Sequence, residues 1–425
     1  MAILKRQKIG EMHMKKTILK WVCGFLAAVF LVAATAVVSF WAAKKSFEDE
    51  SFVAKNNKIS FDEEKVDEDL IAKFKEIKRL IGQEYYLPYD ENNLVEGAID
   101  GMVEGLKDPY TQYFSKQEME SWNSQLQGEY VGTGFIVSEQ TEEYILIGSV
   151  KQETPAAYAQ LQAGDKIVAI NEKKISEYAQ SEIWELFATE GATLELSMVR
   201  NEETMETSLT VSKIVEQSVF SELLENNVGY VRIAAFDAKA AKDFETEVNG
   251  LLTQGMQSMV LDLRDNSGGL ASVMSLIADS ILPDGAMIYY EVDKAGERTQ
   301  VKYSDAKALN IPIVVLVNGS TASVAEVLAS TLRDNKVAEL VGSKTYGKSV
   351  AQITFPFADG SGLILTVAQY YTASNYNIQG NGLQPDKIVE PMDEYKNTKV
   401  QYIPRENDVQ LTAAVSLLTG AENDG

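Results

Sequence analysis

The sequence has 425 residues, of which 45% are hydrophobic and 24% charged, an ordinary composition for a folded chain that is too long for a single core. Eight of its 39 Lys and Arg residues and one of its 62 acids lie in residues 1–45, so the net charge of −23 becomes 31 minus 61, or −30, for the remainder, which disfavours nucleic acid and anionic lipid as partners. The only Cys is Cys23 and the only His is His13, so the body of the chain is expected to lack disulfides, Cys–His and Ser–His–Asp catalytic groups and His-bearing zinc sites. A hydrolytic base there has to be Lys, Asp or Glu.

Residues 21–43 form an uncharged segment that is long enough to cross a bilayer. At about 1.5 Å per helical residue, such a run spans a hydrocarbon core of about 30 Å. Six Lys and Arg residues precede it and only two follow closely. The positive-inside rule therefore predicts a cytoplasmic segment 1–20, a single-pass transmembrane anchor in the cell membrane and an extracytoplasmic body. The alternative is a cleaved signal peptide with Ala34-Thr35-Ala36 as its cleavage site.

A polar stalk and a helical region are expected next. Residues 44–61 are polar and are predicted to be the stalk. Residues 62–127 are predicted to form a helical N-terminal domain, because apolar residues recur at three- and four-residue spacing, as at Leu70, Phe74, Ile77 and Ile81.

Residues 128–213 change to short strands separated by turns, which predicts a compact β module. We expect strands at 134–137, 145–147, 166–170 and 194–199, and helical stretches at 156–161 and 181–189.

Residues 214–395 alternate strand and helix, which predicts an α/β core with helices packed on a sheet. We expect strands at 228–233, 259–263 and 313–317, and helices at 240–254, 270–281 and 324–333. Residues 396–425 are predicted to be a C-terminal helical tail, with a helix at 409–418. The predicted fold class is therefore α/β and multidomain.

A serine stands where an apolar strand runs through a Gly/Ser turn into a helix, in the segment VVLVNGSTASVAEVL at 314–328. Ser323 at such a junction lies beside free helical N–H groups, which stabilise developing negative charge. The alternative is structural, because Ser323 and Glu326 match the S-x-x-E capping box of an ordinary helix start.

Two lysines lie in a glycine-bracketed segment ahead of a strand, at Lys344 and Lys348. A lysine acts as a base only when its environment, chiefly desolvation, lowers its pKa from about 10.4 toward neutrality, and Lys348 is placed for burial where it enters an apolar strand. Gln352 lies four positions on, on the same strand face, where its side-chain oxygen can accept a hydrogen bond from Lys348. The alternative is a pair of surface lysines in a loop.

Paired glycines, Gly268 and Gly269, lie in a polar turn between an apolar strand and a helix. N–H groups at such a turn can hold an oxyanion, and the alternative is that the glycines serve the turn geometry alone. No phosphate-loop pattern follows them.

Taken in order, these motifs resemble the carboxyl-terminal processing peptidases, also called tail-specific proteases, over about residues 62–391. The matching segments are GAIDGM at 97–102, LKDPY at 106–110, GTGF at 132–135, TPAA at 154–157, AGDKI at 163–167, LDLRDNSGG at 261–269, GKSVAQ at 347–352 and GLQPD at 382–386. Tyr110 stands where the family is expected to have His, and Thr321 and Ala325 also depart from its pattern.

The resemblance implies that 214–395 is a serine protease core with a Ser/Lys dyad and no cofactor or metal. Its nucleophile falls on Ser323, its base on Lys348 and the glutamine that supports the lysine on Gln352. The implied oxyanion hole consists of the backbone N–H of Val324 and of one glycine of the pair at 268–269, and which one is left open. Glu326 matches an acid near the site.

The resemblance also implies that 128–213 is a PDZ-like domain, which binds a peptide by strand addition and holds its terminal carboxylate in a backbone nest. That nest is expected at Gly132, Thr133, Gly134 and Phe135, opposite the helix near 181–187. The partners implied are protein or peptide substrates with exposed C-termini, and a homo-oligomer stays open. The competing hypotheses are a non-catalytic PDZ scaffold on a protease-like fold and a hydrolase or transferase that uses a carboxylate pair.

Overall fold

The computed structural model describes residues 68–305 and 308–420. By their internal contacts the described residues form two compact units, one of residues 68–95 with Pro356–Gly360, the other of residues 96–355 and 361–420. The predicted anchor at 21–43 lies outside the described residues. Among the helices in the described part of the chain, none is both long and apolar enough to span a bilayer.

The predicted helical region begins with α2 (Glu68–Glu84) and α3 (Glu91–Glu104). The helix predicted from the apolar spacing at 70–81 is present, but three of the four side chains that defined it are exposed, Leu70 and Phe74 at 57% and Ile77 at 52%, while Ile81 is partly buried. The spacing was therefore a reliable sign of helix and not of burial. Two further elements follow, β1 (Gln112–Phe114) and α4 (Lys116–Leu126).

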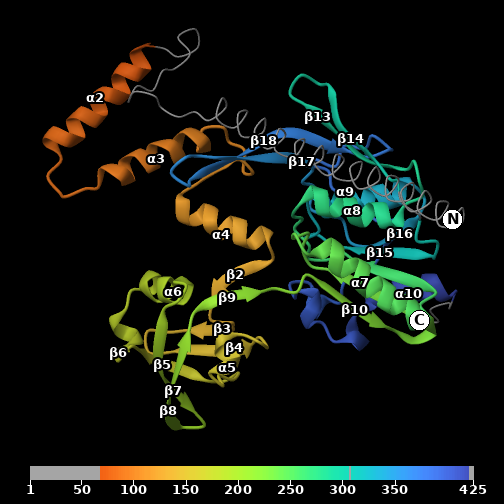
Figure 1. The fold of residues 1–425 in the computed structure, drawn as a ribbon, viewed down its shortest axis with the longest axis horizontal. Helices are drawn as coiled ribbons and strands as arrows, with labels where there is room; N and C mark the ends of the chain where they lie inside the picture. The colour runs from red at the N-terminus through yellow and green to blue at the C-terminus, as the bar shows by residue number, and fades with distance from the viewer. Residues whose placement is uncertain (1–67, 306–307, 421–425) are drawn as a thin grey trace, which may run out of the picture. The chain divides into compact units, whose positions relative to one another are not determined.

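The β module is an antiparallel sheet in the order β3-β4-β5-β7-β8, drawn from gold to yellow-green in Figure 1. Its strands are β3 (Phe135–Gln140), β4 (Ile145–Val150), β5 (Lys166–Ile170), β7 (Thr193–Arg200) and β8 (Glu203–Thr210), with the short β6 (Lys173–Lys174) beside β5. Two helices, α5 (Pro155–Tyr158) and α6 (Gln180–Ala188), complete it. Alternate strand residues such as Ile145, Ile147, Leu194 and Leu196 are buried with Phe187 of α6 in its own core. The antiparallel pair β2 (Glu129–Gly132) and β9 (Ser212–Val215) joins the module to the rest of the chain.

The α/β core is built on a six-stranded sheet in the order β10-β11-β12-β15-β16-β19. Its strands are β10 (Val219–Leu223), β11 (Val228–Ile233), β12 (Ser258–Asp262), β15 (Ile313–Val317), β16 (Ala338–Gly342) and β19 (Lys387–Ile388). The strands from β11 to β19 are parallel and β10 is an antiparallel edge. The central strands are buried along their whole length, as expected for a parallel sheet covered on both faces.

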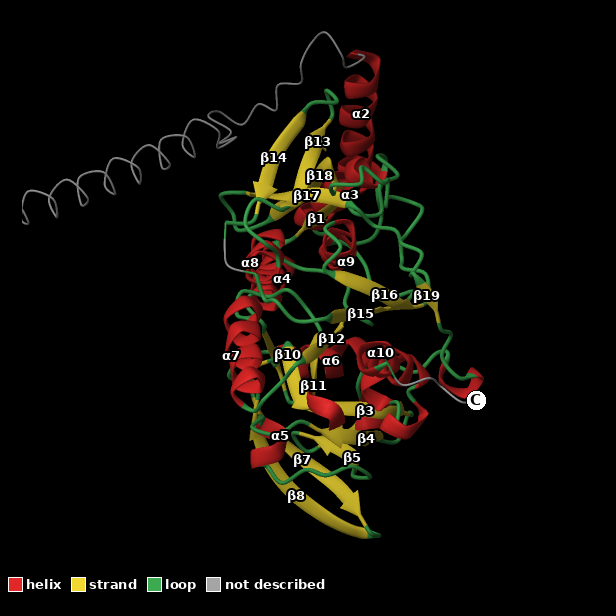
Figure 2. Cartoon of the chain, turned by 90° about the vertical axis from the view of Figure 1, so that its right-hand side faces the viewer, coloured by secondary structure: helices red, strands yellow, loops and turns green. Residues whose placement is uncertain are grey.

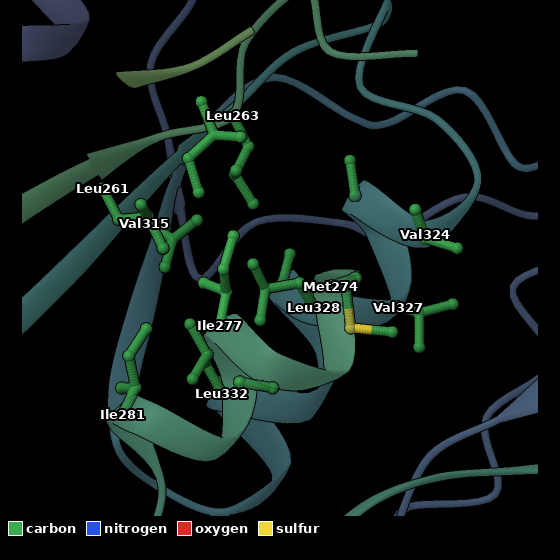
Figure 3. Packing of buried hydrophobic residues seen from close by; sticks show 14 of the residues in the cluster. Leu261, Leu263, Met274, Ile277, Ile281, Val315, Val324, Val327, Leu328 and Leu332 are labelled. Carbon is green, nitrogen blue, oxygen red and sulfur yellow. The ribbon is translucent and has the colours of Figure 1, made fainter. Parts of the chain in front are cut away.

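Helices cover the two faces of this sheet separately, as Figure 2 shows. On one face lie α7 (Ala240–Thr253), α8 (Ala271–Ile281) and α9 (Val324–Asp334), and on the other lies α10 (Val409–Thr419). Alternation along the strands supplies both layers, since Leu261 and Val315 pack toward α8 and α9 while Val260 and Val314 pack toward α10. Figure 3 shows part of the first layer, where Met274 and other α8 side chains meet those of α9.

A second sheet lies beside the core, in the order β1-β18-β13-β14, with β17 also paired to β18. Its longer strands are β13 (Met287–Asp293), β14 (Arg298–Tyr303), β17 (Val350–Pro356) and β18 (Gly362–Tyr371). The three-residue β1 pairs antiparallel with β18, Gln112 opposite Ile364. This pairing brings the chain around Tyr110 to the sheet that also carries the segment after Lys348.

A buried ionic network connects α10 to the strand that leads into the paired-glycine turn. Arg264 is 1% exposed and donates to Asp262 at 2.6 Å and to Asp408 at 2.8 Å. Asp408 is also the N-cap of α10 and accepts the Leu411 N–H at 3.0 Å, while the Tyr230 hydroxyl donates to Asp262 at 2.8 Å. The helix predicted at 409–418 is therefore an integral layer of the core.

Candidate active site

Ser323 lies at the mouth of α9, in the turn that follows β15. Its backbone has φ 59° and ψ −130°, a region that non-glycine residues rarely occupy and that is found at functional sites. The Glu326 carboxylate accepts the Ser323 N–H at 3.1 Å, but the Ser323 hydroxyl makes no cap hydrogen bond to the helix. The Glu326 half of the capping box is therefore present, whereas its hydroxyl half is absent from the described residues, and this hydroxyl is available for chemistry.

Hydrogen bonds fix the turn that carries Ser323 to the turn that carries the paired glycines. The Thr321 hydroxyl donates to the Leu263 carbonyl and accepts the Asn318 N–H, both at 2.9 Å. The Ala322 N–H donates to the Asn266 carbonyl at 2.9 Å. Thr321 departs from the expected family pattern, yet its side chain has a clear structural role.

The paired-glycine turn presses directly against Ser323. A Cβ added at Gly268 would lie 2.8 Å from the Ser323 Cβ and 3.2 Å from its Oγ, and Gly268 has φ +111°, so only glycine fits. The Gly268 N–H is already used, since it donates to the Asn266 side-chain oxygen at 2.8 Å. Asn266 was not singled out by the sequence, although it stands in the LDLRDNSGG segment.

The Gly269 N–H is the better candidate for a second oxyanion donor. The Gly268 carbonyl accepts the Phe236 N–H at 2.9 Å. Because N–H and C=O of a trans peptide point in opposite directions, the Gly269 N–H points away from Phe236. Within the described residues, neither this N–H nor that of Val324, the first residue of α9, donates a hydrogen bond.

Glu326 connects the nucleophile to the segment that carries the lysine. Its buried carboxylate accepts the Ser323 and Lys348 N–H groups on one oxygen, at 3.1 and 2.8 Å, and the Gly347 N–H on the other, at 2.8 Å. The Thr345 hydroxyl donates to that second oxygen as well. Burial raises the pKa of Glu326, and these four donors oppose the rise. Four donors around one carboxylate suit its ionised form.

Lys348 is half-buried, whereas Lys344 is exposed, so the surface-loop alternative holds for one lysine only. Burial lowers the pKa of Lys348 below its ordinary value, and the Asp108 carboxylate opposes part of that fall. The ammonium lies over the ring of Tyr110, with Nζ 4.6 Å from the ring centre. Among the described residues no hydrogen bond joins this Nζ to Ser323, although one carboxylate holds both main chains.

Gln352 lies on β17 but does not bind Lys348 in this conformation. Its side-chain nitrogen instead donates to the main-chain carbonyl of Tyr110. The strand begins at Val350, after Lys348, so the same-face argument does not extend back to the lysine. The structure therefore brings Ser323, Lys348 and Gln352 into one region, and the side chains of the last two meet at Tyr110.

The proposed carboxylate nest at 132–135 connects β2 to β3. Gly134 has φ +88°, and a Cβ there would lie 2.2 Å from the Cβ of Thr154, so the turn requires glycine. In the described chain neither the Thr133 nor the Gly134 N–H donates a hydrogen bond. The Phe135 ring packs edge-on against Phe187 of α6 at 5.2 Å, which places α6 beside this turn as expected.

Three family models match parts of the chain. Residues 227–389 match peptidase family S41, 130–211 match a PDZ domain and 31–118 match the N-terminal domain of the activating protease CtpB. The three matched ranges correspond, respectively, to the α/β core, the β module and the helical region.

Proteins of known sequence and structure are similar over most of the chain. The carboxy-terminal processing protease CtpA of Bacillus subtilis (strain 168) is 30% identical over 307 residues, 72% of this chain and 66% of that protein's length. A CtpA-like serine protease of Staphylococcus aureus (strain COL) is 31% identical over 343 residues, 80% of this chain and 68% of that one. A solved structure assigned to the S41 proteases, from Bacteroides fragilis NCTC 9343, has a TM-score of 0.52 at 22% identity, covers 80% of this chain and 93% of its own, and supports the fold.

Proposed function

Because this chain belongs to peptidase family S41, we propose that it is a serine endopeptidase with Ser323 as nucleophile and Lys348 as base. The observation that carries the proposal is the strained Ser323 at the mouth of α9, with a hydroxyl free of capping and a carboxylate, Glu326, that holds the N–H groups of both residues. The lowered pKa of Lys348, caused by burial, suits a general base.

The reaction is acyl transfer. Neutral Lys348 takes the proton from the Ser323 hydroxyl as its oxygen attacks a peptide carbonyl. The N–H groups of Val324 and Gly269 hold the oxyanion. The protonated Lys348 then gives its proton to the leaving amine, and an acyl-enzyme remains on Ser323. Water, deprotonated by Lys348, hydrolyses that ester and restores the serine.

Substrates are selected through their C-terminal tails. In the described chain the N–H groups of Thr133 and Gly134 donate no hydrogen bond, which supports capture of a terminal carboxylate in the PDZ domain, and the position of β3 at the edge of its sheet supports strand addition. The name of the Bacillus subtilis relative, a carboxy-terminal processing protease, fits the same role.

The catalytic body acts outside the cytoplasm, held at the cell membrane through 21–43. The support is the length of this uncharged segment and the excess of positive charge before it. Extraction of cell membranes tests this: an anchored body is released by detergent but not by high salt. A body found free in the medium would favour the signal-peptide alternative.

The experiment for the activity uses a peptide with an apolar C-terminal tail, incubated with the full chain. We expect cleavage by the wild type and loss of cleavage in Ser323→Ala and in Lys348→Ala with an unchanged circular dichroism spectrum. Full activity of Lys348→Ala rejects the base assignment, and no cleavage of any tailed peptide favours the non-catalytic scaffold. A peptide with an amidated tail tests selection, since equal cleavage argues against carboxylate capture.

A further inference from the structure

Tyr110 contacts both residues that are expected to assist Ser323. The Lys348 ammonium lies 4.6 Å from the centre of its ring, and the Gln352 amide donates to its main-chain carbonyl. These contacts come from two different parts of the residue, the side chain and the backbone. Two separate contacts from one residue to Lys348 and Gln352 indicate that Tyr110 helps to position this pair.

Tyr110 is itself held firmly in place. Its N–H donates to the Asp108 carboxylate at 3.0 Å, and the Thr111 hydroxyl donates to the other oxygen of that carboxylate at 2.7 Å. The same Thr111 hydroxyl accepts the Thr366 N–H at 3.1 Å, which fastens the segment to β18. The main chain that carries the ring is therefore fixed to β18.

The Tyr110 ring favours the charged form of the lysine. The face of an aromatic ring attracts a cation and has no such attraction for a neutral amine. Asp108 adds a negative charge nearby: although burial acts to raise the pKa of Asp108, hydrogen bonds from Thr111 and the Tyr110 N–H hold it below its ordinary value, so it stays ionised. Among the described residues, the other titratable groups near this site are the Tyr346 phenol beside Tyr110 and the Glu326 carboxylate, which accepts the Lys348 N–H.

We propose that Tyr110 is a positioning residue that holds Lys348 in its protonated resting form, and that the lysine leaves the ring for Ser323 when its ammonium loses a proton to water. The free amine so formed is the base that accepts the Ser323 proton. The inference rests on the proposed protease function. It also explains why the resting structure lacks a hydrogen bond between Lys348 and Ser323 in the described residues.

Tyr110→Leu and Tyr110→Phe separate the ring from the rest of the residue, since both keep the backbone contacts. Loss of the ring destabilises the ammonium, so the rise of kcat/KM with pH, which reports the free enzyme, moves to lower pH in Tyr110→Leu by between about half a unit and one and a half units. Tyr110→Phe retains a ring, so its rise stays near that of the wild type. The kcat profile, which reports the bound enzyme, moves less in both variants.

A merely structural role for Tyr110 predicts a different pattern. In that case both Tyr110→Leu and Tyr110→Phe lower the plateau of kcat/KM, and neither moves the pH at which kcat/KM rises. Tyr303→Leu, an exposed tyrosine on β14 of the same sheet, is the matched control and leaves the profile in place. Equal profiles for Tyr110→Leu and the wild type overturn the proposal, as does a Phe variant that shifts as far as Leu.

A second measurement needs no leucine variant. In the full chain with labelled lysine, the Hε protons of Lys348, assigned by their loss in Lys348→Arg, are displaced upfield by the Tyr110 ring at neutral pH and return toward ordinary shifts as the amine deprotonates. Ordinary shifts at neutral pH overturn the proposal even if Tyr110→Leu fails to fold. Failure of the proposed protease function gives a different result. The wild type then cleaves no peptide, or Lys348→Ala cleaves as fast as the wild type, and neither result depends on the Lys348 chemical shifts.

Discussion

Glu326→Gln tests whether the Glu326 carboxylate holds Ser323 and Lys348 in place relative to each other. The carboxylate has four donors, two on each oxygen, and an amide can keep only one oxygen as an acceptor. The better orientation keeps the oxygen toward Ser323 and Lys348, because the Thr345 hydroxyl can turn to accept from the new NH2 group. The Gly347 N–H cannot turn, and it is left buried without an acceptor.

The size of the effect follows from these contacts. An orphaned buried N–H costs about 1–3 kcal/mol, and the loss of charge weakens each of the two retained bonds by about 1 kcal/mol. The Glu326 anion is itself costly to bury, which is why burial raises the pKa of this carboxyl group. The uncharged amide avoids that cost. The two costs sum to about 3–5 kcal/mol, and the avoided cost of burying the anion reduces this, so we expect local opening of this segment to become easier by about 2–3 kcal/mol.

Hydrogen exchange by mass spectrometry measures this directly. Exchange of the peptide covering 343–350 should rise roughly 30- to 150-fold, and kcat/KM should fall by about 10- to 100-fold through misplacement of Lys348. Glu339→Gln, an exposed glutamate on β16, is the matched control and should change neither. Unchanged exchange in Glu326→Gln, with cleavage retained, refutes the role given to the carboxylate.

Three further changes test other parts of the structure. Arg264→Leu leaves two buried carboxylates without their cation and should lower the free energy of unfolding of the core by about 3–5 kcal/mol in urea melts, whereas Arg405→Leu, at an exposed ion pair, should lower it by no more than about 1 kcal/mol. Asp108→Asn removes a charge that favours the Lys348 ammonium, so the pKa of that base falls further and the acid side of the kcat/KM profile should move to lower pH; a move to higher pH contradicts the electrostatic argument. Gly268→Ala places a methyl group 2.8 Å from the Ser323 Cβ and should abolish cleavage while the PDZ domain still binds a tailed peptide, and an active Gly268→Ala enzyme contradicts the turn geometry.

The sequence predicted the core elements closely because their patterns are strong. The strand at 313–317 is β15 at the same residues, and the helix predicted from Val324 begins there. A buried parallel strand is a run of apolar residues, and the Gly/Ser turn after it marks the helix start, so both boundaries are local properties of the chain. The PDZ strand at 166–170 was located equally well, as β5.

The lysine's surroundings could not be predicted in this way. Tyr110 and Asp108 meet Lys348 only because β1 pairs with β18, a contact between segments about 250 residues apart that no local pattern encodes. The expected bond between Gln352 and Lys348 failed for a similar reason, since it assumed one continuous strand where the strand starts later. The exposure of Phe74 on α2 also lay beyond the spacing argument, because periodicity specifies a face and not what covers it.

The Arg264 network has a consequence for when the enzyme can first act. Asp408, which completes that network, and α10, which packs on one face of the central sheet, are made about 140 residues after the glycine turn that Arg264 supports. A nascent chain that has emerged only as far as the serine and lysine therefore still has a bare sheet face and an arginine short of one partner. Proteolytic competence is thus expected to wait until α10 has been made, well after the serine and the lysine.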